Sequence, residues 1–252
     1  MNKIVEICCG SYYDAVQAAL GGAERIELNS ALMLGGLTPT ASTLRLVKEA
    51  FPHLKVVAMV RPRGAGFCYR EEEFQVMMAE CEELLSNGAD GIAFGCLTEE
   101  GNVNIRQTEE MLSLIHRAGK EAVFHRAFDC VQDPFDTMEQ LIALGVNRVL
   151  TSGLQPKATE GATLLKELQA HFGARIEILA GSGVNASNAA ALMRETGILQ
   201  VHSSCKDWLT DPTTVQNGVS YSIAPGAHEL DYDVVSKELV AQLIASVHRT
   251  EI

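Results

Sequence analysis

Short apolar runs alternate with amphipathic segments from one end of the chain to the other. The apolar runs are rich in β-branched residues, which is typical of buried parallel strands, and the segments between them repeat with the period of a helix. The eight candidate strands span residues 4–9, 25–29, 55–62, 90–96, 121–128, 148–152, 176–181 and 199–204. Strands that alternate with helices predict an α/β fold with a parallel sheet.

A repeated turn indicates how this sheet is arranged. Four segments place a helix-terminal glycine, a small or apolar residue and two more residues before a strand: 22–26, 88–92, 145–149 and 197–201. They precede the second, fourth, sixth and eighth strands, so the chain divides into four βαβα quarters. This regularity favours a closed TIM (β/α)8 barrel over an open, doubly wound sheet. Such a barrel needs about 250 residues, so we expect residues 1–252 to form a single domain.

One stretch departs from the alternating pattern. Residues 206–230 follow the eighth strand and contain Asp-Pro, Asn-Gly and Pro-Gly pairs, which are typical of turns. We expect a long loop there that covers part of the barrel mouth. A final helix over residues 232–248 should then complete the fold.

The composition narrows the range of functions. The formal net charge is −12 and the isoelectric point is about 5.0, which argues against a surface for nucleic acid or anionic membranes. No apolar stretch approaches the about 20 residues of a membrane span, and the N-terminus lacks the apolar core of a signal peptide. The seven cysteines have no framework spacing and fit free thiols in a reducing compartment. We therefore expect a cytoplasmic protein that binds neither nucleic acid nor membranes.

Reactive side chains collect where apolar strands end. Phe-His-Arg-Ala-Phe-Asp at 124–129 and Arg-Pro-Arg-Gly at 61–64 both close an apolar run. The C-terminal strand ends form the active face of a TIM barrel, and charged groups are costly there unless they serve a site. We expect one shared cavity. Its candidate catalytic residues are Glu6, Glu27, Arg61, Arg63, His125, Arg126, Asp129 and His202.

In the first two strands, alternation turns five side chains toward the barrel axis: Glu6, Cys8, Arg25, Glu27 and Asn29. Two inward carboxylates on neighbouring strands repel each other unless they pair with arginine or share a proton. The functional interpretation is an acid–base pair or a cation site. The structural alternative is a salt-bridged layer inside the barrel, in which Arg61 or Arg63 pairs with the carboxylates.

Alternation in the fifth strand turns both phenylalanines of 124–129 toward the helices. His125 and Asp129 then share the inner face. Alternation would turn Arg126 to the opposite face, so its direction stays open. The alternative to a functional His125 is a buried histidine whose neighbours satisfy its hydrogen bonds. For His202 the functional and structural interpretations are equally open.

A second group of candidates suits anions. The run Gly-Ser-Gly-Val at 181–184 links the seventh strand to a helix, and backbone N–H groups at such a junction bind phosphate or carboxylate in many barrels. The alternative is that these glycines only make the turn. Three arginines at the strand ends add positive charge to an acidic protein. We expect a small anionic ligand whose binding residues are Ser182, Gly183, Thr151 and Ser152.

Few residues suggest a metal site. Cys8 and Cys9 are adjacent and point to opposite faces of a strand, so they cannot both bind one ion. Cys8 faces the axis and could bind Cu(I), which prefers soft ligands. The alternative is that all seven cysteines are packing residues or inert thiols.

Several of these motifs, in this order, resemble one known family. They are Glu6-Ile7-Cys8, the run at 22–28, Gly35-Gly36-Leu37-Thr38-Pro39, the run at 61–64 with Phe67 and Tyr69, and the runs at 124–129 and 149–153. Together they resemble the CutC family over most of the chain, to about Ser204. The resemblance implies a TIM barrel that often forms homo-oligomers (a dimer or tetramer), a cytoplasmic location and a role in copper homeostasis.

One position departs from the family's copper-binding pattern. Members proposed to bind Cu(I) carry a cysteine directly after the Arg-Ile-Glu-Leu motif, where this chain has Asn29. Two hypotheses remain. The first is a copper homeostasis protein of the CutC type, with Cu(I) at Cys8. The second is a barrel enzyme that uses general acid–base chemistry on a small substrate bearing phosphate or carboxylate, and it is favoured because arginines at the mouth repel a copper cation.

Overall fold

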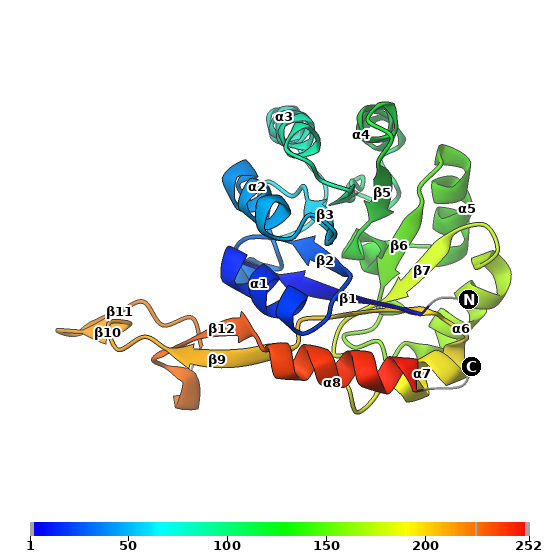
Figure 1. Ribbon diagram of the computed structural model, residues 1–252. Coiled ribbons are helices and arrows are strands. Elements are labelled where there is room, and N and C mark those ends of the chain that lie inside the picture. Colours follow the sequence, from blue (N-terminus) through cyan, green and yellow to red (C-terminus); the bar gives the residue numbers. More distant parts are fainter. Residues whose placement is uncertain (1–2, 225, 250–252) are drawn as a thin grey trace.

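Eight parallel strands close into a barrel in which each strand pairs with the next and β8 pairs with β1 (Figure 1). The computed structural model describes residues 3–224 and 226–249. The barrel strands are β1 Ile4–Cys9, β2 Arg25–Leu28, β3 Lys55–Met59, β4 Gly91–Phe94, β5 Glu121–Phe124, β6 Arg148–Thr151, β7 Glu177–Ala180 and β8 Gln200–Ser203. The TIM (β/α)8 barrel predicted from the alternating pattern is confirmed.

Helices surround this barrel and follow the strands in sequence. They are α1 Tyr12–Leu20, α2 Ala41–Ala50, α3 Glu71–Ser86, α4 Ile105–Arg117, α5 Pro134–Leu144, α6 Ala162–Phe172, α7 Ala189–Thr196 and α8 Lys237–His248, with short 3-10 helices η1 Leu32–Leu34 and η2 Arg126–Cys130. The glycines of the repeated turn have φ values of 93°, 95°, 89° and 75°, a region that favours glycine. They are Gly22, Gly88, Gly145 and Gly197. No helix among the described residues is long and apolar enough to cross a membrane.

The main core lies between the sheet and the helices, whereas the barrel interior carries a polar layer. Large side chains that face the helices, such as Phe94 and Phe124, are fully buried. Inside the barrel, a small apolar cluster of Val57, Met59, Ala93 and Val123 adjoins buried charged and polar residues. These are Glu6, Arg25, Arg148 and Gln200. A polar layer in this position indicates the floor of a functional site, whereas apolar side chains would only fill the barrel interior.

Residues 206–224 and 226–235 form a projecting arm and not the irregular loop expected for 206–230. Strands β9 Lys206–Thr210 and β12 Asp231–Val235 pair as an antiparallel ribbon, with the hairpin β10 Val215–Gln216 and β11 Val219–Ser220 beyond it and η3 Gly226–His228 before β12. The arm extends away from the barrel (Figure 1). Because residues 231–235 pair with 206–210, the final helix begins at Lys237 rather than at residue 232, with Ser236 as its N-cap.

Candidate active site

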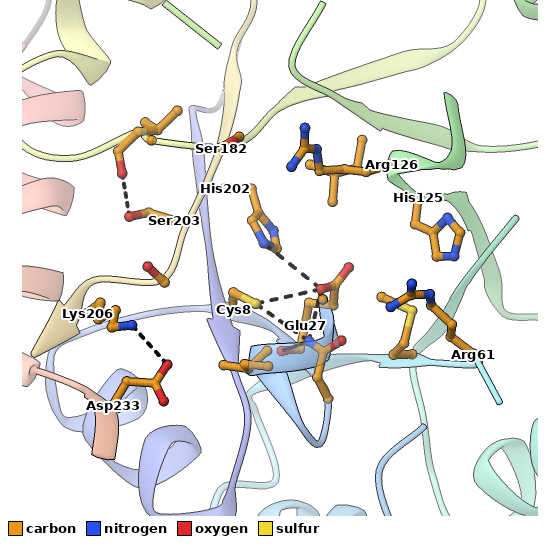
Figure 2. Close-up of a pocket in the computed structure, with 18 of the residues that line it drawn as sticks. Cys8, Glu27, Arg61, His125, Arg126, Ser182, His202, Ser203, Lys206 and Asp233 are labelled. Carbon is orange, nitrogen blue, oxygen red and sulfur yellow. Dashed lines mark hydrogen bonds and ion pairs between the residues drawn. The ribbon is translucent and has the colours of Figure 1, made fainter. Parts of the chain in front are cut away.

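A cavity of about 380 Å³ opens at the C-terminal ends of the barrel strands (Figure 2). It is lined by side chains from most of the strand ends and from the base of the arm. Those with chemistry are Cys8, Glu27, Asn29, Arg61, His125, Arg126, Ser182, Gly183, His202, Lys206 and Asp233. Five of the twelve residues named as catalytic or anion-binding candidates do not line it: Arg63, Asp129, Thr151, Ser152 and Glu6, the last of which lies beneath it. The other seven candidates line the cavity: Glu27, Arg61, His125, Arg126, His202, Ser182 and Gly183.

A buried network joins β1, β2 and β8 one step deeper in the barrel than Cys8. The carboxylate of Glu6 is 1% exposed, and its two oxygens contact Arg25 Nε (2.6 Å) and His202 Nδ1 (2.9 Å). Burial raises the pKa of Glu6, but the charge of Arg25 and the bond from His202 outweigh burial and lower that pKa to about 2. The salt-bridged layer proposed as the structural alternative therefore exists, with Arg25 in the place given to Arg61 or Arg63.

Glu27 is the carboxylate that reaches the cavity. Its Oε2 accepts hydrogen bonds from Asn29 Nδ2 (3.0 Å) and from the Cys8 thiol (3.9 Å), whereas Oε1 has no hydrogen-bond partner among the described residues. Burial raises the pKa of Glu27, and the positive charge of His202 opposes that rise only in part. One oxygen is thus held in place and the other is left for a ligand.

The histidine and the thiol beside Glu27 have altered proton affinities. His202 Nε2 lies 4.0 Å from Glu27 Oε2. Burial lowers the pKa of His202, but its interactions with Cys8, Glu27 and Glu6 raise that pKa well above its usual value. Burial raises the pKa of Cys8, and the hydrogen bond and positive charge of His202 oppose that rise only in part. His202 is therefore a cation and Cys8 a neutral thiol at neutral pH.

His125 is neutral and has a defined tautomer. Its Nδ1 accepts a hydrogen bond from the backbone N–H of Ala127 (3.1 Å), so the ring hydrogen is on Nε2. Burial, together with the charge of Arg61, lowers the pKa of His125 to about 3. Nε2 is buried and has no hydrogen-bond partner among the described residues. The ring packs against Phe67, with 5.0 Å between ring centroids.

The two arginines after β3 have structural partners. Arg61 donates to the backbone carbonyls of Leu34 (2.8 Å) and Gly36 (3.0 Å), and its guanidinium stacks on Phe67 at 5.1 Å. Arg63 pairs with Glu73 and does not line the cavity. Arg61 therefore shapes the cavity wall, and Arg63 holds the following loop.

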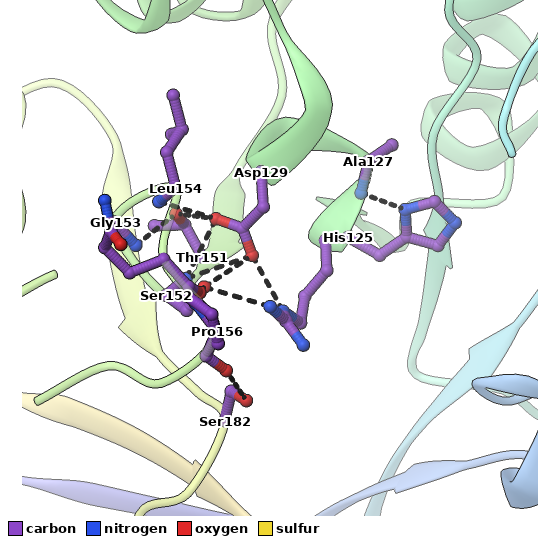
Figure 3. A network of polar contacts seen from close by, with 11 residues as sticks. His125, Ala127, Asp129, Thr151, Ser152, Gly153, Leu154, Pro156 and Ser182 are labelled. Carbon is purple, nitrogen blue, oxygen red and sulfur yellow. Dashed lines mark hydrogen bonds and ion pairs between the residues drawn. The ribbon is translucent and has the colours of Figure 1, made fainter. Parts of the chain in front are cut away.

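Asp129 positions Arg126 and lies outside the cavity (Figure 3). It accepts hydrogen bonds from Thr151 Oγ1 (2.6 Å), from the Ser152 backbone N–H (3.0 Å) and from Arg126 Nε (2.7 Å). Thr151 and Ser152 thus bind an internal carboxylate rather than line a ligand site. The alternation used for residues 125–129 does not apply, because β5 ends at Phe124 and η2 follows it. The 3-10 turn brings Arg126 to the cavity wall.

Ser182 and Gly183 bring backbone to the cavity. Their φ values are +80° and +70°, so the turn after β7 is tight. Ser182 Oγ donates to the Pro156 carbonyl (2.7 Å). An anion would therefore contact the backbone of this turn rather than the Ser182 hydroxyl.

Sequence reasoning missed the contribution of the arm. Lys206 and Asp233 face each other at its base, with Nζ 3.4 Å from Oδ2, and both line the cavity. The signal was the alternation of residues 231–235, of which 232–235 were assigned to the final helix.

Cys8, Glu27 and His202 form a group that could hold a metal ion, because one ligand atom from each lies within 4.8 Å of the others. Cu(I) prefers sulfur ligands, and this group offers one sulfur. That sulfur belongs to a neutral thiol and accepts a hydrogen bond from Asn29 Nδ2 (3.6 Å). The donor set is therefore a poor fit to Cu(I).

Comparison with known proteins places this barrel in a family. The CutC family profile matches residues 3–207. This chain belongs to the CutC family. A CutC family protein of Treponema denticola is 44% identical over 220 residues, covering 87% of this chain and 88% of the relative. A Klebsiella pneumoniae CutC protein is 40% identical, covering 95% of this chain and 96% of the relative.

A solved CutC structure shares the fold. The Streptococcus agalactiae protein, which is named for copper homeostasis, superposes with a TM-score of 0.76 at 29% identity, covering 80% of this chain and 98% of that one.

Proposed function

We propose that this CutC protein is an enzyme that applies general acid–base chemistry to a small anionic substrate, with Glu27 as the group that transfers the proton. The observation that carries the proposal is the state of this carboxylate. It is buried, one oxygen is held by Asn29 and Cys8, and the other has no partner among the described residues. A buried carboxyl with a raised pKa at the wall of a cavity is suited to proton transfer near neutral pH.

The residues around Glu27 keep the site ready for this role. Glu6 stays ionised and accepts from His202 Nδ1 (2.9 Å), so the imidazolium keeps a fixed orientation beside Glu27. Its positive charge stabilises the ionised form of Glu27 and limits the rise of the carboxyl pKa. The pair Glu6–His202 is thus a positioning device for the proton-transfer group.

Positive charge at the cavity wall supports an anionic substrate. Arg126 and Lys206 both line the cavity in a chain with a net charge of −12. The turn at Ser182 and Gly183 adds backbone groups. A volume of about 380 Å³ suits a small metabolite.

Cu(I) binding is the second candidate function, and the group of Cys8, Glu27 and His202 favours it. One neutral thiol provides a weak site, and cations at the cavity wall oppose entry of a metal ion. We also propose a cytoplasmic location, which the seven free cysteines support, and a homo-oligomeric state.

The proposed function is tested with a panel of small phosphates and carboxylates. Compounds that raise the melting temperature are incubated with the protein, and turnover is followed by proton NMR. Glu27→Gln should keep ligand-induced stabilisation and lose turnover by at least about 100-fold. Glu110→Gln, in an exposed ion pair, is the matched control and should keep full activity. Turnover by Glu27→Gln at the wild-type rate would refute the role of Glu27.

A further inference from the structure

His125 presents a hydrogen-bond donor that has no acceptor in the described part of the chain. The side chain is 3% exposed, Nδ1 is engaged by Ala127, and the Nε2–H group has no partner among the described residues. A buried donor without an acceptor is costly and calls for an explanation. Because His125 lines the cavity, a substrate oxygen can meet this need.

The surroundings of His125 keep the ring in its neutral form. Arg61 stacks on Phe67, and Phe67 packs on His125, so a fixed positive charge lies behind the imidazole. The N–H group of a neutral imidazole can donate a hydrogen bond to a substrate oxygen while negative charge develops on that oxygen. The base Glu27 belongs to β2 and the neutral donor His125 follows directly after β5, so the two lie on different parts of the cavity wall.

We propose that the substrate carries a carbonyl group whose oxygen binds His125 Nε2–H, while Glu27 removes a proton from the adjacent carbon. This inference rests on the proposed function and names its reaction class. The C–H bond breaks and its proton goes to Glu27. The electron pair forms a C=C bond, and the carbonyl π electrons move to oxygen, giving an enolate held by His125. Return of a proton to the same carbon re-forms the carbonyl, so that carbon exchanges its hydrogen or is epimerised, with no oxidant or reductant.

Other residues argue against two alternative chemistries. Cys8 is a neutral thiol, so it is a poor nucleophile. Lys206 is 42% exposed in its side chain and pairs with Asp233, whereas lysines that form Schiff bases are commonly desolvated. The anionic group of the substrate then faces Arg126, and the carbonyl faces His125.

The test is exchange of carbon-bound hydrogen in deuterium oxide. The probes are dihydroxyacetone phosphate, pyruvate and 2-oxoglutarate, which combine a carbonyl with an anionic group. Each is first tested for stabilisation of the protein, and proton NMR then follows loss of the signal next to the carbonyl. We expect exchange with at least one probe that stabilises the protein. Glu27→Gln should lower its rate at least 100-fold.

Two variants separate the role of His125 from its packing. His125→Gln keeps an N–H donor and should retain part of the exchange, whereas His125→Leu should lower kcat by about 100-fold or more with a smaller effect on KM. Circular dichroism and melting temperature control for folding. In the wild type, the Nε2–H resonance of His125 should move downfield on binding phosphoglycolohydroxamate, an enolate mimic.

The outcomes distinguish this inference from the proposed function. Binding of the probes without exchange would overturn the enolate chemistry and leave acid–base catalysis on another anion standing. No stabilisation by any probe, and none by the wider panel of anions, would overturn both. A covalent adduct on Lys206 after borohydride treatment would replace the inference with Schiff-base chemistry.

Discussion

His202 donates from Nδ1 to Glu6 Oε1 across 2.9 Å, and the two residues are register partners on β8 and β1. They are 196 positions apart in the chain. The bond therefore spans the seam at which the last barrel strand meets the first, and the proton-transfer site depends on closure of the barrel.

Glu6 should make stability sensitive to acid. The pKa of Glu6 falls from 4.5 to about 2 on folding, so its contribution is complete above pH 4.5 and is lost as pH falls toward 2. The contribution is about 3 kcal/mol. Denaturant unfolding of wild type and Glu6→Gln across this range should show a difference in the free energy of unfolding that shrinks in acid. A constant difference would contradict the pairing.

Asn29 should determine copper affinity. Asn29 Nδ2 lies 3.6 Å from Cys8 Sγ, so a cysteine at this position would bring a second sulfur close to Cys8. We expect Asn29→Cys to tighten Cu(I) binding on the order of 100-fold over wild type, as measured by competition with a chromogenic chelator. Cys8→Ser in the same background should remove the gain. Tight one-to-one binding by the wild type, lost in Cys8→Ser, would restore copper as the primary ligand.

Arg126 should bind the anion, whereas Arg61 should stabilise the fold. Phosphate is expected to raise the melting temperature of the wild type, and Arg126→Ala should abolish this rise without a large loss of stability. Arg61→Ala should cost roughly 3 kcal/mol or more, because buried carbonyls lose their donor. Arg106→Ala, on the surface, is the control. Retained stabilisation in Arg126→Ala would place the anion elsewhere.

The arm should mediate self-association. Val219, Tyr221 and Ile223 are 56%, 80% and 43% exposed, and exposed apolar groups on a projecting segment favour contact with another copy. Light scattering of the wild type should give a multiple of 27.2 kDa. Replacement of Val219 and Tyr221 by serine should give the monomer with an unchanged circular dichroism spectrum. A monomeric wild type would end this prediction.

Much of the fold was available from the sequence, because strand alternation and helix-terminal glycines are local signals. The inward direction of Glu27 and Asn29 followed from alternation in β2. The partner of Glu6 did not, since alternation turns Arg25 inward but gives no register between strands. The register of β1 and β2 places Arg25 beside Glu6, so Arg25 and not Arg61 is its partner.

The remaining differences arose where a strand stops. His125 ends β5 by accepting from Ala127, and the 3-10 turn that follows moves Asp129 out of the cavity and Arg126 into its wall. The arm was missed because its two strands lie more than twenty residues apart, so their pairing is a long-range contact. The turn residues between them predict a loop and give no sign of this pairing.

The seam between β8 and β1 also sets an order of events during protein synthesis. A ribosome that has completed seven strands has released Glu6, Glu27 and His125 but has yet to add His202. Until β8 docks on β1, Glu6 lacks its histidine partner and Glu27 lacks its neighbouring cation. Under the proposed function, truncated or unfinished chains should therefore be inert, and activity should begin only with the complete barrel.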